Sequence, residues 1–320
     1  MTATARKTVM TTGLLITITI IIFLIAQGFK GNIEIKEPKL YAYDTLYSSQ
    51  SYKPHDTLRF AGELVPLSNF DTRESLDREL LTSAYRHSST ILIIKRANRY
   101  FPIIEKILRE YNIPDDFKYL VAAESEYHNV VSPVGATGFW QIMPHTGKEE
   151  GMEINIVVDE RYNIEKSTEF ACRYFLKSYQ KFGNWTLTAA SYNGGRAGIS
   201  DQLEIQNQDN YYDLLLTEET ARYIFRVIAY KLIISDPVKY GFKIDKEDLY
   251  PELKYYEVKV DSAINDMSAF ALKFGTNYKM LKFLNPWLRK PYLTLQPNKE
   301  YQIKIPTEGM RSNDRLEAAN

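Results

Sequence analysis

The chain has 320 residues, enough for one sizeable domain and a second small one. It carries 40 Lys and Arg against 40 Asp and Glu, so no excess charge points to nucleic acid or to an acidic partner. A single cysteine, Cys172, cannot form an internal disulfide, and the four His show no metal-ligand spacing. From composition and spacing we expect no nucleic acid and no metal.

Residues 8–26 contain no charged side chain and are rich in Leu, Ile and Phe. This length is just enough to span a hydrocarbon layer of about 30 Å. Arg6 and Lys7 precede it and favour a cytoplasmic N-terminus with the rest exported. The alternative is a cleaved signal peptide, for which Ala26-Gln-Gly28 is a poor cleavage site. We therefore predict that residues 1–28 form an N-terminal transmembrane helix or a signal segment.

Two outcomes follow for location. An uncleaved segment would anchor the chain in the inner membrane, facing the periplasm, and a cleaved one would leave it periplasmic.

The next stretch, residues 29–70, has no sustained periodicity and contains many polar, Tyr and Ser residues. We predict a tether there.

Helical signals begin at Asp71, which has Glu74 three residues later, as in a capping box. This pair predicts the start of a helix that runs through His87. A second helical run covers residues 91–98, and Pro102 is placed to begin a third that ends near residue 112.

Further along, apolar residues between Phe170 and Phe182 follow 3.6-residue spacing and end at Gly183. A shorter helix is predicted over residues 185–192, and a long one over residues 218–235. Residues 71–242 therefore form a mainly α domain.

After Pro251 the pattern changes. Residues 255–260 and 301–305 alternate with period two, as half-buried strands do. Helical segments are expected between them, at residues 267–274 and 277–284. This βααβ order over residues 253–306 resembles a LysM sugar-binding module. The alternative is an appendage that only stabilises the main domain.

Three segments inside the helical domain carry polar groups suited to glycoside chemistry. Glu124 ends an apolar helical stretch that begins at Tyr119, and burial would hold its proton to higher pH. A glycine-punctuated segment covers residues 132–144, and Ala-Ser-Tyr-Asn-Gly-Gly covers residues 190–195. Taken alone, Glu124 could equally end a helix on a solvated face. No second carboxylate stands out, because Glu126 points to another side of the chain.

In order and residue type, the three segments resemble the motifs of lytic transglycosylases of the goose-lysozyme-like superfamily. The resemblance covers about residues 72–242 and, with the LysM-like module, is greatest to the membrane-bound type D members. One departure is Phe139, where the family commonly has Leu. The resemblance implies a lysozyme-like (goose-type) helical catalytic domain at residues 71–242.

It also implies an enzyme that acts on peptidoglycan glycan strands without a cofactor. In this family one acid, here Glu124, protonates the glycosidic oxygen between N-acetylmuramic acid and N-acetylglucosamine. The same group then removes the proton from the muramyl C6 hydroxyl, which attacks C1. The product has a 1,6-anhydromuramic end.

The remaining motif residues carry over as substrate-binding candidates. Ser132 would contact the N-acetyl or ring-oxygen region, and Gln141 would donate to an acetamido group. Tyr192 would hold Glu124 by a hydrogen bond or contact the sugar, beside Asn193. Tyr223 matches a later tyrosine near the same cleft. Ser132 and Asn193 could instead serve a turn and a helix end.

Two other functions stay open at this point. One is a lysozyme-type muramidase that uses water, and the other is a catalytically silent protein that binds peptidoglycan as a scaffold. The sequence does not separate exolytic from endolytic cleavage.

Overall fold

A computed structural model describes residues 51–53, 57–295 and 299–310. The predicted transmembrane or signal segment (residues 1–28) and most of the predicted tether (residues 29–70) lie outside these residues. Within the described part of the chain, no helix combines the length and the apolar character needed to span a bilayer.

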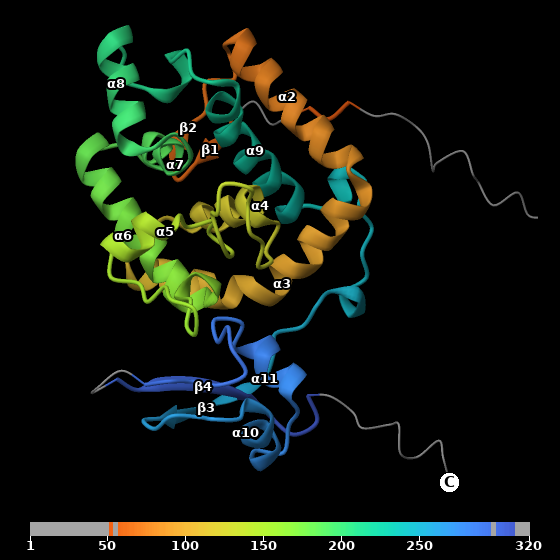
Figure 1. Cartoon of the computed structure of the whole chain (residues 1–320). Coiled ribbons are helices and arrows are strands. Elements are labelled where there is room, and N and C mark those ends of the chain that lie inside the picture. The colour runs from red at the N-terminus through yellow and green to blue at the C-terminus, as the bar shows by residue number, and fades with distance from the viewer. Residues whose placement is uncertain (1–50, 54–56, 296–298, 311–320) are drawn as a thin grey trace, which may run out of the picture. The chain divides into compact units, whose positions relative to one another are not determined.

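Residues 57–250 form a mainly helical domain, as predicted. In Figure 1 the longer helices surround the short helix α4. After the hairpin of β1 (Arg59–Phe60) and β2 (Glu63–Leu64), its α-helices are α2 (Phe70–Tyr85), α3 (His87–Glu110), α4 (Leu120–Ser125), α5 (Pro144–Glu149), α6 (Ile164–Phe182), α7 (Trp185–Gly194), α8 (Arg196–Gln206) and α9 (Glu218–Ser235).

Two predicted helix starts were wrong. Helix α2 begins at Phe70 with Asn69 as N-cap, so the expected capping box at Asp71 does not form. The predicted helices at residues 91–98 and after Pro102 are one continuous helix, α3. Pro102 is tolerated because it lies on the exposed face of α3, where the carbonyl group left without a partner meets water. The predicted stop after α6 is confirmed, with Gly183 left-handed at φ +62°.

Aromatic side chains fill the centre of this domain. Phe117 is fully buried, and its ring centroid lies 5.8 Å from that of Phe60, 4.6 Å from Phe175 and 5.4 Å from Trp185. Phe117 belongs to the 3₁₀ turn Asp115–Tyr119, which leads directly into α4. The aromatic core therefore fixes the start of the helix that carries Glu124.

The C-terminal part has the predicted strand, helix, helix, strand order. Its elements are β3 (Tyr255–Val260), α10 (Met267–Lys273), α11 (Tyr278–Leu284) and β4 (Tyr301–Pro306). The two strands pair antiparallel, with Tyr256 opposite Ile305. Asp266 and Asn277 cap the two helices through their side chains, which explains why each helix begins where it does.

Backbone hydrogen bonds and an ion pair join the C-terminal part to the helical domain. Val158 forms an isolated β-bridge with Leu288, and Val157 and Val158 belong to the C-terminal apolar core. The ammonium of Lys304 pairs with Glu165 of α6. The two parts therefore share a core as well as a surface contact.

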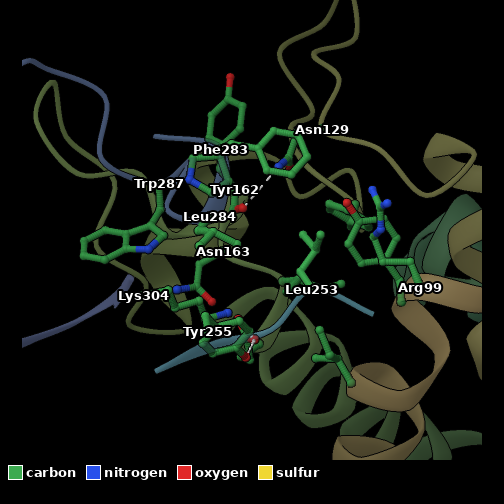
Figure 2. A pocket seen from close by; sticks show the side chains of 16 residues that line it. Arg99, Asn129, Tyr162, Asn163, Leu253, Tyr255, Phe283, Leu284, Trp287 and Lys304 are labelled. Atoms are coloured by element: carbon green, nitrogen blue, oxygen red, sulfur yellow. Dashed lines mark hydrogen bonds and ion pairs between the residues drawn. The ribbon is translucent and has the colours of Figure 1, made fainter. Parts of the chain in front are cut away.

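A pocket of about 70 Å³ lies where these parts meet. Figure 2 shows Trp287, Tyr255 and Phe283 of the C-terminal part around it, with Arg99, Asn129 and Tyr162 of the helical domain. Glu124 does not line this pocket.

The aromatic core gives a first prediction. Phe117→Ala should lower the free energy of unfolding by about 3–5 kcal/mol, because it removes a fully buried ring and leaves a cavity. The matched control is Phe70→Ala, since Phe70 is 75% exposed; its effect should stay within about 0.5 kcal/mol. Urea denaturation of both variants checks this, and similar losses for the two would contradict the assigned core.

Candidate active site

Glu124 lies in the last turn of α4, just after a fully buried apolar run from Leu120 to Ala122. Its side chain is half-buried. The hydroxyl of Tyr223 donates a hydrogen bond of 2.6 Å to Glu124 Oε1. Tyr223 comes from α9 and is 1% exposed. This contact joins two helices and fixes the direction of the carboxyl group.

Burial raises the pKa of Glu124 from 4.5 to about 7. The hydrogen bond from Tyr223 acts the other way, because it stabilises the carboxylate. The charge of Glu219 raises the pKa further, whereas that of Arg226 lowers it. A carboxyl group with a pKa near neutrality can both give and accept a proton under physiological conditions.

The backbone just after Glu124 is strained. Glu126 and Tyr127 are consecutive non-glycine residues in the left-handed region, at φ +53° and +56°. Such residues cost about 1–3 kcal/mol each unless their surroundings hold them. Arg86 pairs with the Glu126 carboxylate at 2.8 Å, and the Tyr127 hydroxyl donates to the carbonyl of Lys118 at 3.1 Å. These bonds keep the chain turning away at the end of α4.

The segment that follows, residues 130–142, folds into a small hairpin that we call the glycine hairpin. Thr137 and Ile142 exchange backbone hydrogen bonds of 3.1 and 3.0 Å. The hydroxyl of Ser125, next to Glu124, donates to the carbonyl of Phe139 at 2.7 Å. The hairpin is therefore tied directly to α4.

Gly138 cannot be replaced without moving this hairpin. Its φ is +87°, and an added Cβ would lie 2.0 Å from the carbonyl oxygen of Arg161. Both facts exclude an ordinary side chain. The glycine in the motif is thus needed for close packing against Arg161.

Ser132 and Gln141 both belong to the glycine hairpin, with different outcomes for their predicted roles. The Ser132 hydroxyl accepts from the Ala136 N–H at 3.0 Å, so it supports the turn. The Gln141 amide donates to the carbonyls of Val130 at 3.1 Å and Gly138 at 2.8 Å. Because these bonds use both amide hydrogens, Gln141 differs from the predicted donor and offers its side-chain oxygen instead.

Tyr192 lies on α7 and packs edge-on against the ring of Trp140, with centroids 6.1 Å apart. Its hydroxyl donates to the carbonyl of Trp140 at 2.7 Å. Tyr192 was predicted to hydrogen-bond Glu124 or to contact the sugar; its hydroxyl bonds to the hairpin backbone, and the hydrogen bond to Glu124 comes from Tyr223. Burial, and secondarily the charge of Glu124, raise the pKa of Tyr192 well above its usual value.

Asn193 joins the end of α7 to the start of α9. Its amide donates to Glu219 at 3.3 Å, and its side-chain oxygen accepts from the Thr220 hydroxyl at 2.9 Å. Glu219 and Arg226 were not predicted as site residues. The only sequence signal for Glu219 was its place in the first turn of a helix, where acids are common.

Among the described residues, no group of three or more His, Cys, Asp or Glu could hold a metal ion.

Two family models match the chain. Residues 101–215 match the transglycosylase SLT domain, and residues 256–309 match the soluble lytic transglycosylase C-terminal LysM-like domain. The first match contains Glu124 and the glycine hairpin, and the second contains the βααβ unit. Both resemblances drawn from the motifs are confirmed.

Among curated proteins, the chain is similar to membrane-bound lytic murein transglycosylase D of Escherichia coli strain K12. The two are 27% identical over 239 residues, which cover 72% of this chain and 51% of that protein. The same figures hold for the protein of this name from Escherichia coli O6:H1. The chain thus spans about half the length of the curated relatives it matches.

Two solved structures also show similarity. The match to the 70 kDa soluble lytic transglycosylase of Escherichia coli has a TM-score of 0.40 and 20% sequence identity; it covers 61% of this chain and 34% of that one. The match to an inactive mutant of the lytic transglycosylase Slt of Pseudomonas aeruginosa has a TM-score of 0.34 and 17% identity; it covers 47% of this chain and 26% of that one. TM-scores this low do not by themselves establish a common fold.

The raised pKa of Glu124 gives a stability prediction. Because the folded state binds this proton more tightly than the unfolded chain, Glu124 destabilises the protein increasingly as the pH rises from 4.5 to about 7. Glu124→Gln should therefore be more stable than the wild type by about 3 kcal/mol at pH 8, with little difference at pH 4.

Denaturant melts at the two pH values measure this difference. Glu74→Gln is the control, because Glu74 is exposed and its replacement should have no such pH dependence. Equal effects of Glu124→Gln at pH 4 and pH 8 would contradict the buried, raised-pKa carboxyl.

Proposed function

We propose that this chain, which carries a transglycosylase SLT domain and a LysM-like domain, is a peptidoglycan lytic transglycosylase. It cleaves the β-1,4 bond between N-acetylmuramic acid and N-acetylglucosamine and leaves 1,6-anhydromuramic ends. The similar proteins named above, all lytic transglycosylases, support this interpretation.

One observation carries the proposal: Glu124, half-buried and held by Tyr223, has a pKa of about 7. In the first step the protonated carboxyl gives its proton to the glycosidic oxygen, and the bond from muramyl C1 breaks. In the second step the resulting carboxylate takes the proton of the muramyl C6 hydroxyl as that oxygen bonds to C1. Glu124 ends protonated again, and no water is consumed.

A single group can do both steps because its pKa lies between those of a strong acid and a strong base. The attacking hydroxyl is part of the same sugar, which replaces a bimolecular encounter by an internal one. In the family that the motifs resemble, the substrate's own N-acetyl group assists by stabilising the positive charge that develops at C1.

The glycine hairpin and α7 supply the proposed binding groups. Ser132 can donate its hydroxyl hydrogen, since its oxygen already accepts from the backbone. Gln141 offers its side-chain oxygen to an N–H such as that of an acetamido group. Asn193 lies beside Glu219 at the entrance to α9, where its contact with sugar would compete with its helix contacts. Tyr192 and Tyr223 act by holding the hairpin and Glu124.

We also propose that the enzyme works outside the cytoplasm. Residues 1–28 would anchor it in the inner membrane facing the periplasm, or would be removed after export. The charge-free stretch at residues 8–26 and the name of the similar membrane-bound protein support this location.

Hydrolysis by a muramidase is the second candidate, and Glu219 is the observation that favours it. Its charge acts on Glu124, so a second carboxylate stands within electrostatic reach of the acid. Glycosidases that use water need such a partner. Glu219 is exposed and bonded to Asn193, however, and this position favours a role in tuning Glu124.

The mass of the released products tests the function. Purified sacculi treated with the wild-type chain should release muropeptides that are one water lighter than hydrolysed ones. Glu124→Gln should reduce this release by about 10³-fold or more, because the amide can neither give nor take the proton. Tyr192→Phe should keep far more activity than Glu124→Gln.

Each other outcome identifies a competing reading. Products that contain the added water would support the muramidase. Equal solubilisation by the wild type and Glu124→Gln would remove Glu124 from the reaction and favour a binding protein.

Tyr223→Phe should shift the pH dependence of activity. The loss of its hydrogen bond removes a stabilisation of the carboxylate, so the pKa of Glu124 rises above about 7. The alkaline limb of kcat/KM should move up by about one pH unit. Tyr192→Phe is the control, because its hydroxyl bonds to Trp140 and the limb should stay in place. If the alkaline limb of kcat/KM does not move in Tyr223→Phe, this hydrogen bond does not set the pKa of Glu124.

A further inference from the structure

A buried ion pair lies beneath the glycine hairpin. Arg161 and Asp159 are 8% and 7% exposed. The guanidinium donates to both carboxylate oxygens of Asp159, from Nε at 3.0 Å and from Nη2 at 2.8 Å. A bidentate pair of this kind fixes the plane of the guanidinium.

The remaining guanidinium nitrogen contacts the hairpin at two separate points. Arg161 Nη1 donates to the carbonyl of Gly135 at 3.0 Å and to that of Ile142 at 3.1 Å. The backbone carbonyl of Arg161 is also the atom that leaves no room for a Cβ at Gly138. Arg161 therefore sets the distance between the tip of the hairpin and its base.

The partner of Arg161 is in turn bonded to the LysM-like domain. The N–H of Asp159 donates to the carbonyl of Trp287 at 2.9 Å, and the N–H of Arg289 donates to the carbonyl of Val157 at 2.7 Å. Val158, one residue before Asp159, is 1% exposed and lies in the apolar core of that domain. A continuous set of bonds thus runs from the LysM-like domain to the hairpin.

We propose that Arg161, aligned by Asp159, is a positioning residue for substrate binding, and that the LysM-like domain holds this pair in place. The LysM-like domain is then a structural part of the active site. This inference rests on the proposed function, because it assigns the hairpin groups Ser132 and Gln141 to the glycan.

Lysine cannot replace Arg161 in this role. An ammonium is a single point of charge, whereas the guanidinium presents donors in a fixed fork. Lys at position 161 would keep the charge beside Asp159 but could not also reach Gly135 and Ile142 in the same geometry. Arg161→Lys therefore separates hairpin positioning from the loss of a buried charge.

The first experiment compares Arg161→Lys with the wild type in the full chain, using soluble uncrosslinked glycan strands. We expect KM to rise about tenfold or more and kcat to change less than about threefold, because the hairpin binds the ground state and the transition state alike. The alkaline limb of the pH profile should not move, since Glu124 keeps Tyr223. Lys304→Met is the control: it breaks another, partly buried ion pair of the same junction, with Glu165, whose side-chain hydrogen bonds go to Tyr255 and not to the glycine hairpin, and KM should stay unchanged.

The second experiment tests the contribution of the LysM-like domain with two equal changes in one core. Val158 and Val260 are both buried there, but only Val158 adjoins Asp159. Val158→Ala should raise KM severalfold more than Val260→Ala, at a similar loss of stability of about 1 kcal/mol.

The results separate this inference from the proposed function. A wild-type KM in Arg161→Lys would overturn the positioning role of Arg161. Equal KM values for Val158→Ala and Val260→Ala would overturn the role of the LysM-like domain. If the wild type releases no anhydro products, the proposed function itself fails.

Discussion

The hydrogen bond between Tyr223 and Glu124 is the contact on which the proposed chemistry depends. Burial alone would push the pKa of Glu124 upward until the group gave up its proton only with difficulty. The hydroxyl of Tyr223 offsets part of that effect and leaves the pKa at about 7. The balance exists only where α4 and α9 meet, so the whole helical domain serves to hold these two side chains together.

The backbone near Glu124 is strained and closely packed. Two consecutive left-handed residues, Glu126 and Tyr127, turn the chain away from the acid, and Gly138 packs directly on the backbone of Arg161. These features are unfavourable one by one and persist because bonds from Arg86, Tyr127 and Arg161 hold them. The site is therefore rigid where it holds the acid and the hairpin.

The contacts of Val157 and Val158 join the LysM-like domain to the helical domain. A module joined by a flexible linker would bind polymer independently of catalysis. Here the helical domain contributes two residues to the core of that module, and the module contributes a carbonyl to Asp159. On the inference drawn above, the position of the LysM-like domain and the geometry of the site are coupled through packed side chains, which transmit displacement because they leave little free volume.

The sequence by itself indicated the longer helices, the βααβ unit and one candidate acid, but not the β1–β2 hairpin, α5 or α8. Periodicity gave the mainly helical domain and the βααβ unit, and the order of the three motifs indicated Glu124 and its family. Only the tertiary structure decided that Tyr223, and not Tyr192, is hydrogen-bonded to Glu124. It also decided that both amide hydrogens of Gln141 bond to backbone carbonyls and that Arg161 supports the hairpin. The physical reason is range. Helix and strand patterns arise from neighbours a few residues apart, whereas these hydrogen bonds join residues 99, 52 or 26 positions apart. The bonds of Gln141 lie within a turn whose geometry sequence spacing does not reveal.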